Sequence, residues 1–68
     1  MNLKEYAEAI KVIHSCSALT LWCFYRSKKQ KPMTKDYILA NLPSLKSEDN
    51  LLKNIDYLKE RGFIIELK

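Results

Sequence analysis

The sequence contains three imidazole or thiol side chains, the groups that bind zinc most often in proteins. His14 is the only histidine, and Cys16 and Cys23 are the only cysteines. Together they offer three potential zinc ligands, but their spacing is not one of the recognised zinc patterns. We therefore expect no metal site and no cofactor, and we expect His14 at a helix surface or an interface.

The sequence shows no other recognised catalytic motif. No motif places a general base or an activated nucleophile near His14. A glycine-rich phosphate loop needs several glycines, and Gly62 is the only one present. The sequence therefore predicts a protein that is not an enzyme.

The strongest chemical signal is a run of basic residues without an acid. Six of the eight charges in residues 1–33 are positive, whereas residues 34–68 carry six of each sign, which gives a net charge of +4. The run consists of Arg26, Lys28, Lys29, Lys31 and Lys35. Such a patch attracts polyanions. It is equally compatible with a solvated helix end, where cations are favoured by the helix dipole.

Composition and length indicate one folded domain, residues 1–68. The chain is 47% hydrophobic and 29% charged, which is typical of a globule rather than a disordered tail. A core of this size supplies about 3–5 kcal/mol of net stability, so dimerisation is a reasonable way to bury more surface. The polar start, Met1 to Ala9, has no secretory signal, and we expect a cytoplasmic protein.

One apolar stretch, Val12 to Tyr25, is followed by basic residues, as in a short membrane anchor. It is well short of the ~20 residues that cross a bilayer, and it contains His14, Ser15 and Thr20. We therefore expect no membrane association.

Residues 1–30 form an N-terminal helical part. Residues 3–14 read as an amphipathic helix, with its apolar face at Leu3, Tyr6, Ala7, Ile10 and Ile13. A second segment, residues 18–28, is apolar nearly all round and belongs at the centre of the domain or in an oligomer interface. Residues 15–17 have poor helix propensity, so residues 3–28 could form one helix or two. If both cysteines share a helix, they are roughly 10 Å apart and cannot form a disulfide.

Residues 31–68 begin with a short capped helix. Pro32 forces an extended or turned approach, and Thr34 is the predicted N-cap of a helix over residues 35–42. We expect Tyr37, Ile38 and Leu42 to face inward. Pro43 ends this helix, and residues 43–46 form a tight connection.

A longer capped helix follows. Ser47 is its predicted N-cap, and the helix runs to about Arg61, with Gly62 in the left-handed position beyond its end. Its apolar stripe is Leu51, Leu52, Ile55 and Leu58. Residues 63–67 are β-prone and predict a strand, which must pair either with residues 31–33 or with the same strand of another subunit.

This order of elements resembles the winged-helix and helix-turn-helix family of DNA-binding regulators, particularly small phage- or plasmid-type ones. Residues 33–42 correspond to the first helix of the motif, and residues 51–64 to the second helix and the entry to the wing. The pattern of Ile55, Leu58, Gly62, Phe63 and Ile64 is frequent at that corner. The resemblance implies a mainly α, three- to four-helix domain with one short C-terminal strand. It also implies a transcriptional regulator that binds double-stranded DNA.

In that family the second helix, here about residues 48–61, enters the major groove, and the first lies across the phosphates. Asn50 and Asn54 would contact adenine, and Lys53 guanine or phosphate. The candidate DNA-binding residues that the resemblance implies are Lys31, Thr34, Lys35, Lys46, Ser47, Asn50, Lys53, Asn54 and Tyr57.

Two features depart from that pattern. Glu48 and Asp49 open the second helix, where two acids repel a phosphate backbone, and only one strand follows the helix. Both features favour an alternative, in which the same scaffold is a protein-interaction module, an inhibitor or adaptor that does not bind DNA. For either function we predict a homodimer, with the N-terminal helices or the final strand at its interface.

Overall fold

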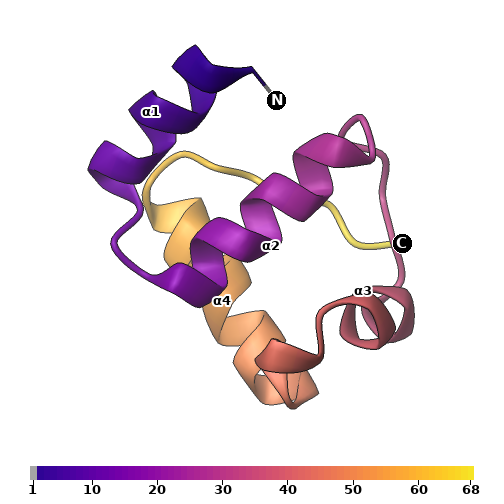
Figure 1. The fold of residues 1–68 in the computed structure, drawn as a ribbon. Helices are drawn as coiled ribbons and strands as arrows, with labels where there is room; N and C mark the ends of the chain where they lie inside the picture. Colours follow the sequence, from indigo (N-terminus) through magenta and orange to yellow (C-terminus); the bar gives the residue numbers. More distant parts are fainter. Residues whose placement is uncertain (1) are drawn as a thin grey trace.

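The computed structural model describes residues 2–68, and these are mainly helical, as predicted (Figure 1). Four α-helices and one 3-10 helix follow one another along the chain. They are α1 (Leu3–Val12), α2 (Cys16–Ser27), α3 (Lys35–Asn41), the 3-10 helix η1 (Pro43–Leu45) and α4 (Glu48–Glu60).

Every α-helix begins at a side chain that caps it. Asn2, Ser15, Thr34 and Ser47 each accept a hydrogen bond from a backbone N–H three residues further on. Such a bond satisfies one of the amides that a helix start leaves without a partner. The predicted caps Thr34 and Ser47 are confirmed. Ser15 starts a new helix, so residues 3–28 form two helices rather than one.

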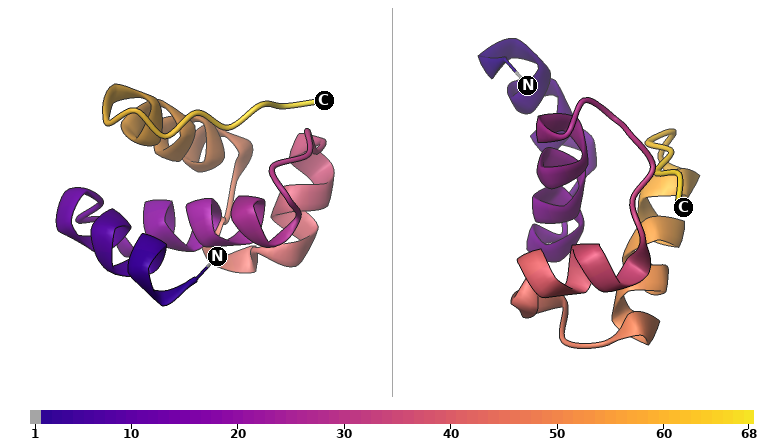
Figure 2. Two further views of the ribbon diagram at one scale, coloured as in Figure 1. Left: turned by 90° about the horizontal axis from the view of Figure 1, so that it is seen from above. Right: turned by 90° about the vertical axis from the view of Figure 1, so that its right-hand side faces the viewer.

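The helices α1, α2 and α4 lie in two layers. In the view from above, α1 and α2 share one layer, and α4 with the C-terminal tail forms the other (Figure 2). Leu21 and Ala18 of α2 and Leu51 and Leu58 of α4 are fully buried where the layers meet. The apolar character of α2 all round therefore places it at the centre of the domain, as the sequence predicted.

Most of the apolar face predicted for residues 3–14 does not pack, and Ile13 is the member of it that is buried. Leu3 is 83% exposed, and Tyr6 and Ile10 are 41% and 42% exposed. The buried residues are Ala9 and, just after the helix, Ile13. Arg26 of α2 pairs with Glu5, which fixes α1 with its small Ala9 side towards the core. Only one side of this short helix meets the domain, so most of its apolar stripe is left in solvent.

The two helices of the second half also differ in detail from their predicted faces. Ile38 of α3 is fully buried, whereas Tyr37 is 43% exposed. Leu52 of α4 is 39% exposed, although it was expected in the buried stripe. Tyr37 and Leu52 each adjoin a fully buried residue, Ile38 and Leu51 respectively. So small a domain can bury only a narrow face of each helix.

The tail that follows α4 is extended but is not a strand. Gly62 has the expected left-handed conformation, with φ at 87°. Within residues 2–68, the β-pairing consists of one parallel bridge between Met33 and Leu67, and the Lys68 N–H donates to the Met33 carbonyl at 2.9 Å. The predicted partner segment is therefore the right one, but the pairing is too short to make a ladder.

None of the helices described is long and apolar enough to cross a membrane.

Candidate nucleic-acid interface

The connection between α2 and α3 contains an unusual backbone turn. Lys29 and Gln30 are both left-handed, with φ at 60° and 58°. This conformation is strained for a residue that has a Cβ, and glycine usually takes it. The Gln30 N–H donates to the carbonyl of Tyr25 at 3.1 Å, which closes the end of α2. The chain therefore turns sharply here without a glycine.

This turn carries three lysines without acidic partners. Lys28, Lys29 and Lys31 are all exposed, and none lies within ion-pairing distance of a carboxylate among residues 2–68. We call residues 28–31 the lysine turn. Three unpaired ammonium groups in so short a segment create a local positive potential and repel one another. Binding an anion there would reduce this repulsion.

An open hollow of about 350 Å³ adjoins the lysine turn. Six residues from α2, the α2–α3 connection and α3 line it: Ser27, Lys28, Lys29, Lys31, Met33 and Tyr37. Its lining therefore combines three ammonium groups with an apolar and an aromatic side chain. Such a combination suits a ligand that has both a negative charge and a flat apolar surface.

The start of α3 adjoins the turn but contributes less charge than its sequence indicates. Thr34 uses its hydroxyl to cap the helix, accepting from the Tyr37 N–H at 3.1 Å. Lys35 forms an ion pair with Glu48 at the start of α4. The hydrogen bond that Lys35 donates to the Glu48 carboxylate, together with the charge of that carboxylate, raises the pKa of Lys35. The Glu48 carboxylate therefore already offsets the positive charge of Lys35.

The predicted base-reading residues near the start of α4 are partly engaged with their own helix. Ser47 caps α4 by accepting from the Asn50 N–H at 3.2 Å. Asn54 donates its side-chain amide to the Asn50 carbonyl at 2.7 Å. The Asn50 side chain and Lys46 are exposed, and Lys46 has a left-handed backbone with φ at 69°.

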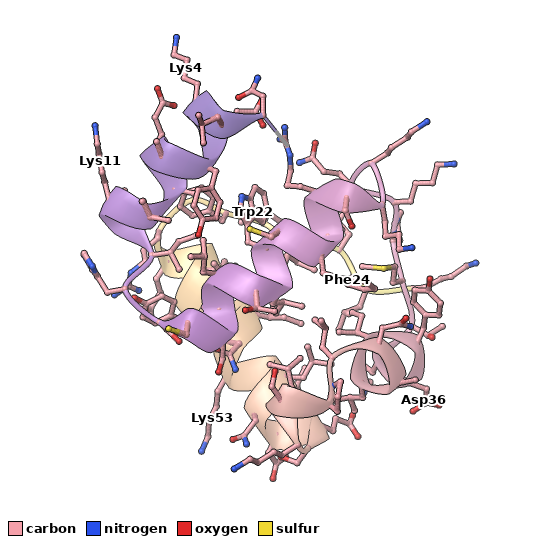
Figure 3. The ribbon with its side chains drawn as sticks, in the orientation of Figure 1. Lys4, Lys11, Trp22, Phe24, Asp36 and Lys53 are labelled. Carbon is pink, nitrogen blue, oxygen red and sulfur yellow. The ribbon has the colours of Figure 1, made fainter. Side chains whose placement is uncertain are left out.

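Lys53 projects from a face of α4 that is more acidic than basic. Its helix carries four carboxylates and two lysines. Asp49, four residues before Lys53, and Asp56, three residues after it, lie on the same exposed face. Figure 3 shows Lys53 extending from the lower left of the molecule, whereas the lysine turn lies at the upper right of Figure 1 in the same orientation. These two groups of basic residues do not form one surface.

Tyr57 has a structural role in this arrangement. Its hydroxyl accepts a hydrogen bond from the His14 N–H at 2.9 Å, which ties α4 to the link between α1 and α2. The guanidinium of Arg61 lies 3.6 Å from the centre of its ring. Both the ring and the hydroxyl therefore already have partners within the chain.

The nine candidate residues thus divide into two places. Lys31, Thr34 and Lys35 lie at the lysine turn and the start of α3, and the other six lie at or along α4. The resemblance did not single out Lys28, Lys29 or Tyr37, which line the same hollow as Lys31. The run of basic residues was visible in the sequence. The exposure of Tyr37 was not, because its helical position suggested an inward side chain.

The thiols and the possible metal ligands lie away from the lysine turn or apart from one another. Both cysteines are free thiols on α2, and burial raises the pKa of the Cys23 thiol. Among residues 2–68, no three His, Cys, Asp or Glu side chains are close enough together to hold a metal ion.

No protein-family model matches this chain, and no curated protein and no solved structure is significantly similar to it.

Proposed function

We propose that the protein binds DNA, chiefly through the phosphate backbone, and that the lysine turn is its principal contact. The observation that carries this proposal is the exposure of Lys28, Lys29 and Lys31 side by side without acidic partners. Ammonium groups in this state bind phosphates and release the counterions condensed on DNA. Backbone contacts of this kind supply most of the affinity of non-specific DNA binding.

The packing of α3 on α4 supports a helix-turn-helix interpretation of the same surface. The two helices are joined through η1 and contact one another. In helix-turn-helix proteins the first helix crosses the backbone and the second meets the major groove. In our proposal, Lys31 and the start of α3 continue the phosphate contact that begins at the lysine turn, and the extended tail after Gly62 takes the place of a wing.

Base readout by α4 is the weaker part of this function. Asn50 and Lys53 are exposed and have the chemistry to contact adenine and guanine. Asp49 and Asp56 flank Lys53 and repel phosphates on either side of it. We therefore propose a regulator whose affinity depends on charge more than on sequence, with dissociation that is sensitive to salt.

Fluorescence anisotropy with a labelled mixed-sequence duplex tests this proposal. We expect the affinity to fall steeply with salt, with a slope of roughly −0.9 for each phosphate contact. A triple variant, Lys28→Gln, Lys29→Gln and Lys31→Gln, should reduce that slope by about three contacts. The proposal fails if the wild-type protein does not bind duplex DNA at low salt.

A matched control removes the same charge elsewhere. Lys4 and Lys11 extend outward from α1 in Figure 3, and Lys59 is exposed on α4. Replacing these three lysines by glutamine changes the net charge equally. If this control weakened binding as much as the lysine-turn variant, net charge rather than the turn would be responsible.

A second candidate function is protein binding through α4. The specific observation is that Leu52 is 39% exposed on a face that also presents Asp49 and Asp56. An apolar centre with an acidic border suits a basic protein surface. This alternative predicts a stoichiometric partner that co-purifies with the wild-type protein but not with Leu52→Lys, and no binding to DNA.

A further inference from the structure

We infer that the hollow beside the lysine turn binds an unpaired nucleobase, so that the protein prefers single-stranded to fully paired nucleic acid. This inference rests on the proposed function, because the same three lysines hold the phosphates. The inference adds a role for the aromatic side chain of the hollow, which contact with a duplex backbone would not use.

The aromatic part of the hollow comes from α3. Tyr37 is 43% exposed, although it belongs to a helix whose next residue, Ile38, is fully buried. Its ring lies beside Phe24 of α2, with the ring centres 6.1 Å apart and the planes at 33°. Figure 3 shows Phe24 on the part of α2 that faces α3. Phe24 thus supports one side of the Tyr37 ring, and the exposed part of the ring borders the hollow.

The cationic part lies within reach of the same aromatic pair. The Lys28 ammonium is 5.5 Å from the centre of the Phe24 ring, which is within the range of a cation–π contact. Lys29 and Lys31 also line the hollow. A nucleotide seated here would place its base against Tyr37 and its flanking phosphates among the ammonium groups.

The backbone keeps these lysines in place. Two consecutive left-handed residues, Lys29 and Gln30, are strained, and the Arg26 guanidinium supports the turn by donating to Gln30 Oε1 at 3.5 Å. Backbone strain of this kind concentrates at ligand sites, where it fixes side chains before the ligand arrives. The fold therefore sets where these lysines leave the backbone before a ligand arrives.

The shape of the site selects against a paired base. Bases in a duplex are stacked on one another, and only their edges and the backbone are accessible. An exposed aromatic ring beside a basic groove instead stacks on bases of single strands, and the preference is largely independent of sequence. The hollow therefore matches a single strand, a loop or a frayed end.

The test compares three labelled probes of equal length, about eight nucleotides, which lies within the usual site size for single strands. The probes are oligothymidine, an abasic strand with the same phosphates, and a duplex. We expect the wild-type protein to bind oligothymidine about tenfold more tightly than the abasic strand. The variant Tyr37→Ala should bind the two single strands equally, whereas Tyr37→Phe should retain the preference.

The outcomes separate this inference from the proposed function. If oligothymidine and the abasic strand bind the wild-type protein equally, or if Tyr37→Ala weakens both alike, the base site is wrong while the phosphate contacts stand. If the duplex binds the wild-type protein as tightly as oligothymidine does, the preference for single strands is wrong, and if no probe binds, the proposed function and the base site both fall. Because Tyr37 is exposed, Tyr37→Ala should fold normally, which its helical circular dichroism can verify.

Discussion

At the scale of single residues, the two cysteines differ in their surroundings although both belong to α2. Cys16 is exposed at the first turn of the helix, whereas Cys23 is partly buried. Burial disfavours the charged thiolate, which is why the pKa of Cys23 is raised. The thiolate is the reactive form, so this difference has a chemical consequence.

We predict that an alkylating reagent modifies Cys16 first. At mildly alkaline pH, where the raised pKa of Cys23 keeps most of it in the unreactive thiol form, a limiting amount of iodoacetamide should give a singly modified protein labelled at the exposed Cys16. Peptide mass spectrometry locates the label. Cys23→Ser should react at the wild-type initial rate and Cys16→Ser several-fold more slowly; equal rates for the two variants would contradict the prediction.

At the scale of elements, the helix starts were the part of the structure most accessible from sequence. A cap is a local interaction between residues three apart, so Thr34 and Ser47 could be identified without knowing the fold. Which way a helix turns its side chains depends instead on distant partners. The exposure of Tyr37 and Leu52 follows from how much of α3 and α4 the rest of the domain covers, and no short pattern contains that information.

We predict that Ser47→Ala lowers the stability of the fold by about 1 kcal/mol, the usual cost of losing a side-chain N-cap. For a domain of this size the loss corresponds to roughly 4–8 °C in Tm. Ser44→Ala, an exposed serine in η1, is the control and should leave Tm unchanged. Thermal unfolding followed by circular dichroism checks both, and equal Tm values for the two variants would show that the cap is not used.

The lysine turn could not be foreseen from sequence for a related reason. Left-handed turns are usually signalled by glycine, and residues 28–31 contain none. Pro32 indicated only that the chain leaves the helix before it. The strain at Lys29 and Gln30 is a consequence of the whole connection between α2 and α3, which must reverse within a few residues.

We predict that Gln30→Gly stabilises the protein by about 1 kcal/mol, because the strain that glycine relieves in the left-handed conformation outweighs the loss of the long, exposed hydrogen bond from Arg26 to the Gln30 side chain. Gln30 is uncharged, so the three lysines remain. Lys28→Gly is the comparison: its φ is −95°, so glycine relieves no strain there and should destabilise the helix end. Urea unfolding measures both free energies. Destabilisation by both substitutions would contradict the strained turn.

At the scale of the whole molecule, the order of apolar, capping and turn residues predicted the mainly helical fold. It did not predict that the candidate DNA-binding residues would lie on separate surfaces. The nine residues implied by the resemblance are spread between the α2–α3 connection and α4. Three of them, Thr34, Ser47 and Tyr57, already hold the fold together. A sequence resemblance predicts a binding surface correctly only if tertiary packing leaves the same side chains exposed. The local spacing of residues does not determine that packing.

The exposed stripe of α1 leads to the last prediction, which concerns self-association. Leu3, Tyr6 and Ile10 present an apolar face that the domain does not cover, and a core this small gains from burying more surface. We expect a homodimer in which the α1 helices of two copies cover one another. An antiparallel arrangement centred between residues 6 and 7 would set Leu3 against Ile10 of the second copy, and Tyr6 against the small Ala7. Lys4, Glu8 and Lys11 lie on the other side of the helix, so their charges stay in water.

Sedimentation equilibrium at about 100 µM, the weak end of micromolar association, should show the dimer for the wild-type protein. Ile10→Glu should give a monomer, because it places two carboxylates in the apolar contact. Ile64 is 52% exposed on the C-terminal tail, which is the other surface that could pair with a second copy. A monomer produced by Ile64→Glu but not by Ile10→Glu would move the interface from α1 to the tail, and a monomeric wild-type protein at this concentration would contradict self-association by either route.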